Sequence, residues 1–145
     1  MKKIYIGADH GGFNTKEDII PLLTELGYEV VDVGTYDEES VDYPDYAKKV
    51  ADQVVSDRAL GILICGTGVG MAIAANKVKG VRAANISDVF SAKMLRAHNN
   101  GNILCLGART VGPELHKEII RAFLGTEFEG SRHERRVNKI VALEN

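Results

Sequence analysis

The sequence has few of the features that mark exported or membrane proteins. Its 145 residues include two cysteines, three prolines and no tryptophan. Neither Cys65 nor Cys105 belongs to a Cys-x-x-Cys motif. The apolar run near the first residue is too short for a signal peptide, and no run approaches the ~20 apolar residues of a membrane helix. We therefore expect a cytoplasmic protein in which both thiols are reduced.

The sequence also lacks a strong charge of either sign. Its net charge is −2, so it has no overall attraction for nucleic acid or for an anionic membrane. Hydrophobic residues make up 45% and charged residues 26%, which is typical of a globular protein. Length and the lack of repeats or linkers predict a single domain over 1–145.

Short apolar runs alternate with amphipathic segments of helix length. Strands are predicted at Lys3–Ala8, Glu29–Val33, Leu60–Ile64, Val81–Ile86 and Ile103–Leu106, and helices at Asn14–Leu26, Asp45–Ser56, Val69–Lys77, Asp88–His98, Glu114–Leu124 and His133–Leu143. In the first helix Leu26 is expected on the buried face, and in the second Asp45 is expected as the cap. The alternation predicts an α/β, Rossmann-like domain with a five-stranded parallel sheet, helices on both faces and a C-terminal helix.

Ligands of such sheets bind beyond the carboxyl ends of the strands. That rule selects four segments: Asp9–Gly12, Gly34–Tyr43, Cys65–Gly70 and the residues after Leu106. The third is the richest, because Gly66, Gly68 and Gly70 follow a strand and open a helix. Backbone N–H groups there can form a cradle for negative charge. The alternative is a tight turn that needs glycine for packing.

Known glycine motifs do not fit this loop. A Walker A loop would need Lys-Ser/Thr where Met71-Ala72 stands, and the dinucleotide fingerprint needs Gly-x-Gly-x-x-Gly. Asp88 does lie about twenty residues further on, as a ribose-binding acid would. A non-catalytic nucleotide-binding module therefore remains an alternative.

The position of Cys65, where the cradle begins, suggests a reactive thiol. A thiol near a helix N-terminus becomes a thiolate more readily and can then act as a nucleophile or a base. The alternative is a small buried residue at the end of a strand. Cys105 has no such loop beside it and is predicted to be a core residue.

Other candidates follow the same edge. Asp9 and His10 pair a carboxylate with an imidazole, for handling protons or hydroxyls or as a polar turn with a cap. Tyr43 offers a phenol in a loop or simply a turn, and Arg109 follows the last strand.

Two further groups lie near helix ends. His98 can titrate near neutral pH or serve as a helix cap. Arg132 and Arg136 are one helical turn apart and could clamp a phosphate, or they could form a solvated face. No aromatic residues are interleaved with these arginines, so a nucleic-acid site is not expected. The four histidines are scattered without metal-like spacing, so no metal site is predicted.

Together these residues resemble the type B ribose-5-phosphate isomerase family, whose relatives include galactose-6-phosphate and allose-6-phosphate isomerases. The resemblance covers essentially the whole chain and is most specific in the Cys-Gly-Thr-Gly-Val-Gly block. The matching segments are Gly7–Phe13, Asp42–Pro44, Cys65–Lys77, His98-Asn99, Gly107–Arg109, Arg132-His133 and Arg136. Some members use a glutamate just past the glycine loop in place of cysteine. Met71 stands there in this chain, which favours Cys65.

The resemblance implies a specific set of roles. Cys65 would be the base that moves a proton between carbons two and one of the open-chain sugar, and Thr67 would help to move protons between oxygens. The remaining roles would be the enediolate cradle (Gly66, Gly68, Gly70), ring opening (Asp9, His98), sugar contacts (Tyr43, Asn99) and phosphate binding (His10, Arg109, Arg132, Arg136). It implies no cofactor and a homodimer or homotetramer with shared sites.

Overall fold

The computed structural model describes residues 1–144. Its elements in chain order are β1 (Lys3–Ala8), α1 (Phe13–Glu25), β2 (Glu29–Asp32), α2 (Tyr43–Asp57), β3 (Leu60–Cys65), α3 (Val69–Ala75), β4 (Ala83–Asn85), α4 (Val89–Ala97), β5 (Ile103–Gly107), α5 (Pro113–Leu124), α6 (Arg132–Val141) and a 3₁₀ turn, η1 (Ala142–Glu144). The predicted alternation of strands and helices is confirmed, and most bounds differ by one or two residues.

The sheet within these residues has five parallel strands in the order β2-β1-β3-β5-β4. Its central strands β1, β3 and β5 are adjacent, so the loops that follow them meet at one edge. In the register, Ala8 pairs with Ile64 and Cys65 pairs with Gly107. The candidate segments that begin at Asp9, at Cys65 and after Leu106 therefore leave the sheet at neighbouring points.

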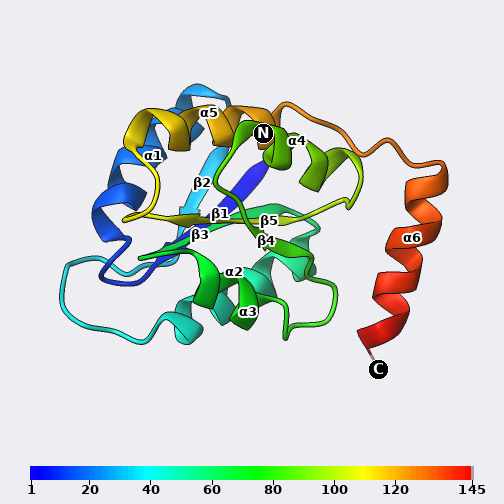
Figure 1. Ribbon diagram of the computed structural model, residues 1–145. Helices are drawn as coiled ribbons and strands as arrows, with labels where there is room; N and C mark the ends of the chain where they lie inside the picture. Colours follow the sequence, from blue (N-terminus) through cyan, green and yellow to red (C-terminus); the bar gives the residue numbers. More distant parts are fainter. Residues whose placement is uncertain (145) are drawn as a thin grey trace.

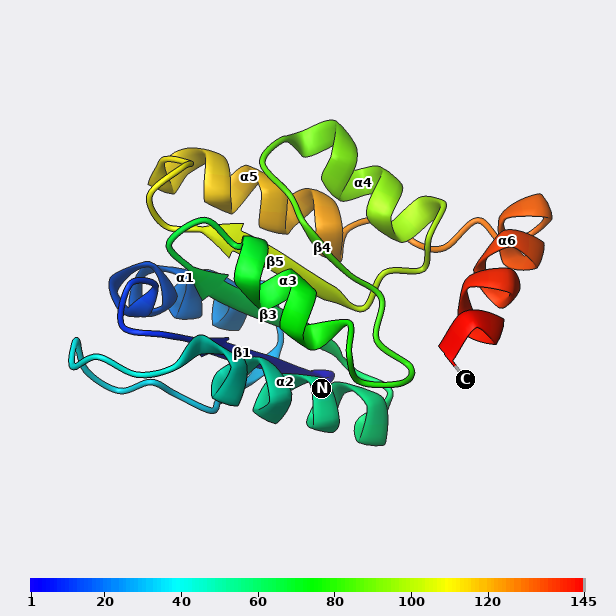
Figure 2. The same ribbon diagram turned by 60° about the horizontal axis from the view of Figure 1, so that its bottom comes forward.

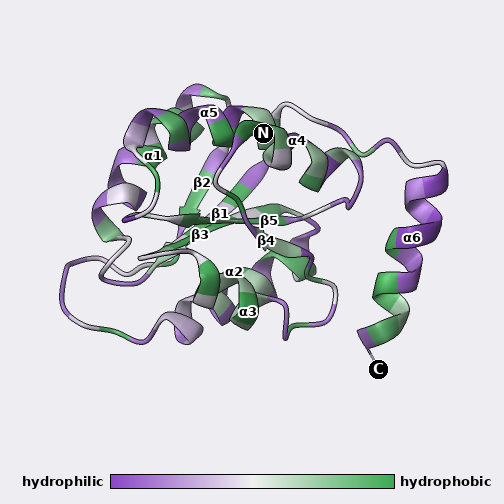
Figure 3. Ribbon diagram, in the orientation of Figure 1, coloured by the Kyte–Doolittle hydropathy of each residue, from purple (hydrophilic) through white to green (hydrophobic). Residues whose placement is uncertain are grey.

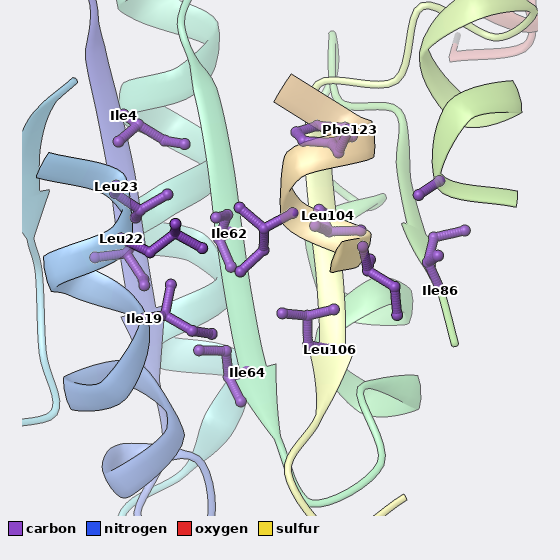
Figure 4. Packing of buried hydrophobic residues seen from close by; sticks show 14 of the residues in the cluster. Ile4, Ile19, Leu22, Leu23, Ile62, Ile64, Ile86, Leu104, Leu106 and Phe123 are labelled. Carbon is purple, nitrogen blue, oxygen red and sulfur yellow. The ribbon is translucent and has the colours of Figure 1, made fainter. Parts of the chain in front are cut away.

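Helices cover both faces of the sheet. Figures 1 and 2 show α1, α4 and α5 on one face and α2 and α3 on the other. Alternate strand residues point to each side. Figure 4 shows the core on the face covered by α1, α4 and α5. It includes Ile4, Ile62 and Leu104 of the strands with Leu23 of α1 and Phe123 of α5, all of them fully buried.

On the second face of the sheet, α2 packs very close to strand β3. Leu63, Cys65 and Cys105 point toward α2 and α3. Gly61 allows α2 to approach, because a methyl group there would lie 2.8 Å from side-chain carbons of Val50 and Val54. Figure 3 shows hydrophobic residues concentrated along the strands and the inward sides of the flanking helices. Cys65 therefore ends a strand whose side chains on this face are core residues.

Two local expectations are wrong. Leu26 is not on the buried face: it is the C-cap of α1 and is 41% exposed. The helix ends there because Gly27, with a φ of +94°, adopts a left-handed conformation. Asp45 is not the cap of α2, because Pro44 lies in the first turn and the helix begins two residues earlier, at Tyr43, after Asp42.

The C-terminal helix α6 stands beside the sheet layers and not upon them. Figure 2 shows it at the end of the molecule opposite the 33–42 loop. His133 and Val137 are its buried residues, whereas Arg132 and Arg136 are exposed. None of the helices described between residues 1 and 144 combines the length and apolar character that crossing a bilayer requires.

Candidate functional site

The candidate site lies at the carboxyl edge of the sheet, where three loops are tied together by backbone hydrogen bonds. Asp9 N–H donates to the Ile64 carbonyl (3.2 Å), which anchors the loop after β1 to the end of β3. Ala108 N–H donates to the Cys65 carbonyl and Arg109 N–H to the Gly66 carbonyl, both at 2.9 Å. The relative positions of these loops are thus fixed by the sheet and its extensions.

Cys65 lies at the centre of this edge and is 6% exposed. Its Sγ accepts a hydrogen bond from the Gly68 N–H at 3.2 Å. Gly68 has a φ of +82° and directly precedes α3, a backbone conformation that glycine adopts without steric cost. The loop therefore folds back on the sulfur and points the Gly68 N–H at it.

A cation and a carboxylate converge beside the loop. A methyl group on Gly66 would lie 3.2 Å from Arg109 Nη1, and one on Gly11 would lie 3.6 Å from Nη2. The same position on Gly11 is 3.4 Å from Asp9 Oδ1, which accepts the Gly12 N–H at 3.1 Å. Glycine at positions 11 and 66 therefore leaves room next to both charged groups.

Two residues from other loops complete the wall of the site. Tyr43, the first residue of α2, lies against α3, since a methyl group on Gly70 would be 2.6 Å from its ring and 3.1 Å from its hydroxyl oxygen. His10 Nδ1 accepts the Val41 N–H at 3.2 Å. That contact fixes the imidazole to the 33–42 loop and leaves Nε2 as the ring nitrogen for a ligand.

Thr67 and Asn85 flank the glycine loop. Thr67 is exposed, and its hydroxyl oxygen accepts the Val69 N–H at 3.3 Å. A methyl group on Gly68 would collide with Asn85 Oδ1. Sequence reasoning missed Asn85, although it is a polar residue at the end of β4, the same signal that singles out Asp9 after β1.

The remaining predicted residues lie elsewhere in this chain. His98 is the C-cap of α4, and α4 returns to the amino edge, where β5 begins. Asn99 lines a hollow there with Arg82 and Ile140. With Arg132 and Arg136 on α6, these residues do not meet Cys65 within one chain.

His98 does meet His133. The two rings stack with centroids 4.1 Å apart and planes 10° apart. Glu129 lies beside both, and burial chiefly lowers the pKa of His133, with the neighbouring His98 adding to the effect. The expectation that the histidines are scattered is therefore wrong for this pair, because α6 begins against the end of α4.

Two other predicted features have structural roles. Asp88 is the N-cap of α4 and accepts the Ser91 N–H at 2.7 Å, a hydrogen bond that lowers the pKa of Asp88. This use leaves the nucleotide-binding alternative without support from its proposed ribose acid. Cys105 is fully buried, and burial raises the pKa of its thiol, which confirms it as a core residue.

The carboxyl edge thus combines a thiol, a loop of N–H donors, a carboxylate, an imidazole, a phenol and a guanidinium. Such a set can move protons at carbon and oxygen while holding an anionic substrate.

Comparisons with known proteins agree on one family. A family model for Ribose/Galactose Isomerase matches residues 4–140. The chain is 51% identical over 145 residues to ribose-5-phosphate isomerase B of Escherichia coli K12, covering 99% of this chain and 97% of that protein.

Solved structures agree with the sequence match. A ribose-5-phosphate isomerase B of Clostridium thermocellum superposes with a TM-score of 0.96 at 52% identity, covering 98% of this chain and 97% of that one. A ribose-5-phosphate isomerase B of Mycoplasma genitalium, solved with bound ribulose-5-phosphate, gives a TM-score of 0.94 at 46% identity, with 98% and 95% covered.

Proposed function

The chain belongs to the Ribose/Galactose Isomerase family, and from that premise we propose that it interconverts ribose 5-phosphate and ribulose 5-phosphate through an enediolate, with Cys65 as the base. The reaction places it in the pentose phosphate pathway. The observation that carries the mechanism is the contact between Cys65 Sγ and the Gly68 N–H at the mouth of the glycine loop.

The proton transfer runs in balanced steps. The Cys65 thiolate removes the proton from carbon two of the open-chain aldose, which leaves an enediolate whose negative charge lies on the oxygen of carbon one. The hydroxyl on carbon two loses its proton to become the ketone, and the thiol returns its proton to carbon one. Thr67 carries protons between the two oxygens.

The loop stabilises the charge that develops on oxygen. N–H groups of Gly66, Gly68 and Gly70 hold the enediolate, an arrangement worth roughly 10²–10³ in rate. A positioned base adds roughly 10²–10⁴. The chemistry moves protons only, so we propose no redox cofactor and no metal in the catalytic cycle.

Binding of the sugar phosphate uses the remaining groups. Arg109, Arg132, Arg136 and His10 bind the phosphate, and Tyr43 and Asn99 contact the sugar. Asp9 and His98 assist opening of the furanose ring, because the isomerisation requires a free aldehyde.

The active enzyme is proposed to be a homodimer or homotetramer in the cytoplasm, each chain a single domain over 1–145. His98, Asn99, Arg132 and Arg136 lie far from Cys65 in one chain. In the assembly a second copy supplies them to the site. The exposed arginines on α6, which stands off the sheet layers, support this arrangement.

The substrate is tested by turnover of ribose 5-phosphate in the presence of a chelator, beside allose 6-phosphate and galactose 6-phosphate. The highest kcat/KM is expected for the pentose. A higher value for either hexose would reassign the substrate, and no turnover of any of the three would reject the isomerase.

Site sharing is tested by mixing two inactive variants, Cys65→Ala and His98→Asn. If sites are shared, a hybrid dimer contains one intact site, so random reassembly restores about a quarter of wild-type activity. No recovery after verified subunit exchange would place both residues in the site of one chain.

A further inference from the structure

The cluster of His98, Glu129 and His133 brings three potential metal ligands together at the end of α4. The N–H of Glu129 donates to the Ala97 carbonyl at 3.0 Å, which pins this residue beside His98. His133 lies in the first turn of α6, and its N–H donates to the Gly130 carbonyl at 3.0 Å. Backbone hydrogen bonds therefore hold Glu129 and His133 in place.

The ligand atoms are spaced nearly as a metal needs. Glu129 Oε1 lies 3.5 Å from His133 Nε2 and 4.0 Å from His98 Nε2, and one ligand atom from each residue lies within 4.8 Å of the others. Around a tetrahedral ion with bonds of about 2.0–2.2 Å, neighbouring ligand atoms are about 3.4 Å apart. The Glu129–His133 pair already has that spacing, whereas His98 Nε2 is farther from Glu129, at 4.0 Å.

A second observation points to a missing ligand. His133 is 6% exposed, and its Nε2 has no hydrogen-bond partner within residues 1–144. Buried polar atoms without a partner are rare in folded proteins. This nitrogen faces Glu129, so an ion between them would satisfy it.

We propose that His98, Glu129 and His133 form a binding site for a zinc-like divalent transition metal. Two imidazoles and one carboxylate suit zinc, with a water in the fourth position, and are too rich in nitrogen for magnesium or calcium. No thiol of the same chain belongs to the cluster, because Cys65 lies at the other edge of the sheet.

Binding requires one local rearrangement. In the stack the lone pairs of the two imidazoles run side by side and cannot converge on one ion. His98 has 39% of its side chain exposed and can turn, and the half-exposed Glu129 can follow, whereas the buried His133 stays fixed.

The consequence for activity rests on the proposed function. A metal on His98 occupies the nitrogen that would handle the proton during ring opening. Zinc is therefore a reversible inhibitor of this enzyme, and the active form is the metal-free enzyme obtained with a chelator.

The test uses Co²⁺ as a spectroscopic probe and Zn²⁺ as the inhibitor, with full-length wild type and two variants. Glu129→Gln removes a ligand, and Glu127→Gln is the matched control that removes an exposed carboxylate two residues away. Wild type and Glu127→Gln should bind Co²⁺ with visible bands of tetrahedral type. Glu129→Gln should bind at least about 10–100-fold more weakly, yet turn over normally in chelator.

The outcomes separate the site from the function. Co²⁺ binding by Glu129→Gln equal to that of wild type would overturn the site. Binding as expected without loss of turnover in Zn²⁺ would overturn the inhibition. Co²⁺ binding that depends on Glu129 in a protein with no isomerase activity would support the site and reject the proposed function.

Discussion

Removing one partner of the buried ion pair between Lys16 and Asp32 should destabilise the protein far more than removing one partner of an ion pair on the surface. Lys16 is completely buried in α1, and its Nζ lies 2.6 Å from Asp32 Oδ2 and 3.0 Å from Glu17 Oε1. Asp32 Oδ1 also accepts the Gly34 N–H at 2.9 Å. The pair therefore joins α1 to the start of the 33–42 loop.

Replacing Asp32 by Asn keeps the acceptor for Gly34 but leaves the ammonium of Lys16 buried with a weaker partner. Breaking one side of a buried pair costs about 3–5 kcal/mol. Because Asp32 is 26% exposed and Glu17 remains, we expect a loss near 3 kcal/mol, or about 1–3 M in the urea midpoint. The Lys16→Met/Asp32→Asn double variant should recover most of it, since neither charge is then present.

The control is the exposed pair of Lys48 and Asp52 on α2, whose side chains are 71% and 46% exposed. Asp52→Asn should cost only about 0.3–0.5 kcal/mol. Urea unfolding of both single variants and the double variant decides the matter. If Asp32→Asn costs no more than Asp52→Asn, the reasoning from burial is refuted.

Two further predictions concern the site, and a third concerns His116, a buried histidine of α5. Gly68→Ala should reduce kcat about 10²-fold or more, because its φ is +82° and the methyl group would collide with Asn85; unchanged kcat in steady-state assays would argue against the cradle. Arg109→Ala should raise KM for the sugar phosphate about 10–100-fold, since a hydrogen bond to a charged group is worth about 1.5–3 kcal/mol; a change in kcat alone would contradict a binding role. Burial lowers the pKa of His116 from 6.5, so the unfolded chain takes up a proton first on acidification. The free energy of unfolding should therefore fall as pH drops below about 6.5, less steeply in His116→Gln, and equal slopes in the two proteins would refute this.

The fold was predictable because periodicity and glycine signals agree along the chain. The strands at Lys3–Ala8 and Leu60–Cys65 are apolar runs of strand length, and their parallel order follows from the helices between them. The strand-end rule then located Asp9, Cys65 and Arg109 at one edge. Errors fell at helix ends such as Asp45, where Pro44 moved the start of α2 upstream.

The second part of the site could not be derived from one chain. Sequence reasoning grouped His98 with Cys65 through family resemblance, whereas topology returns α4 to the amino edge of the sheet. The stack of His98 on His133 joins residues 35 positions apart, and no local pattern encodes that contact. Asn85 was missed for a simpler reason, because a short strand left its end poorly defined.

The central claim is that Cys65 is the base, and it is tested most directly by turnover of ribose 5-phosphate in chelator by wild type, Cys65→Ala and Cys105→Ala. The second variant removes the other buried thiol, which lies in the core. Folding of each is checked by thermal unfolding. Loss of at least about 10²-fold in kcat for Cys65→Ala alone is the predicted result. Wild-type turnover by a folded Cys65→Ala protein would contradict the account and require another residue to move the proton.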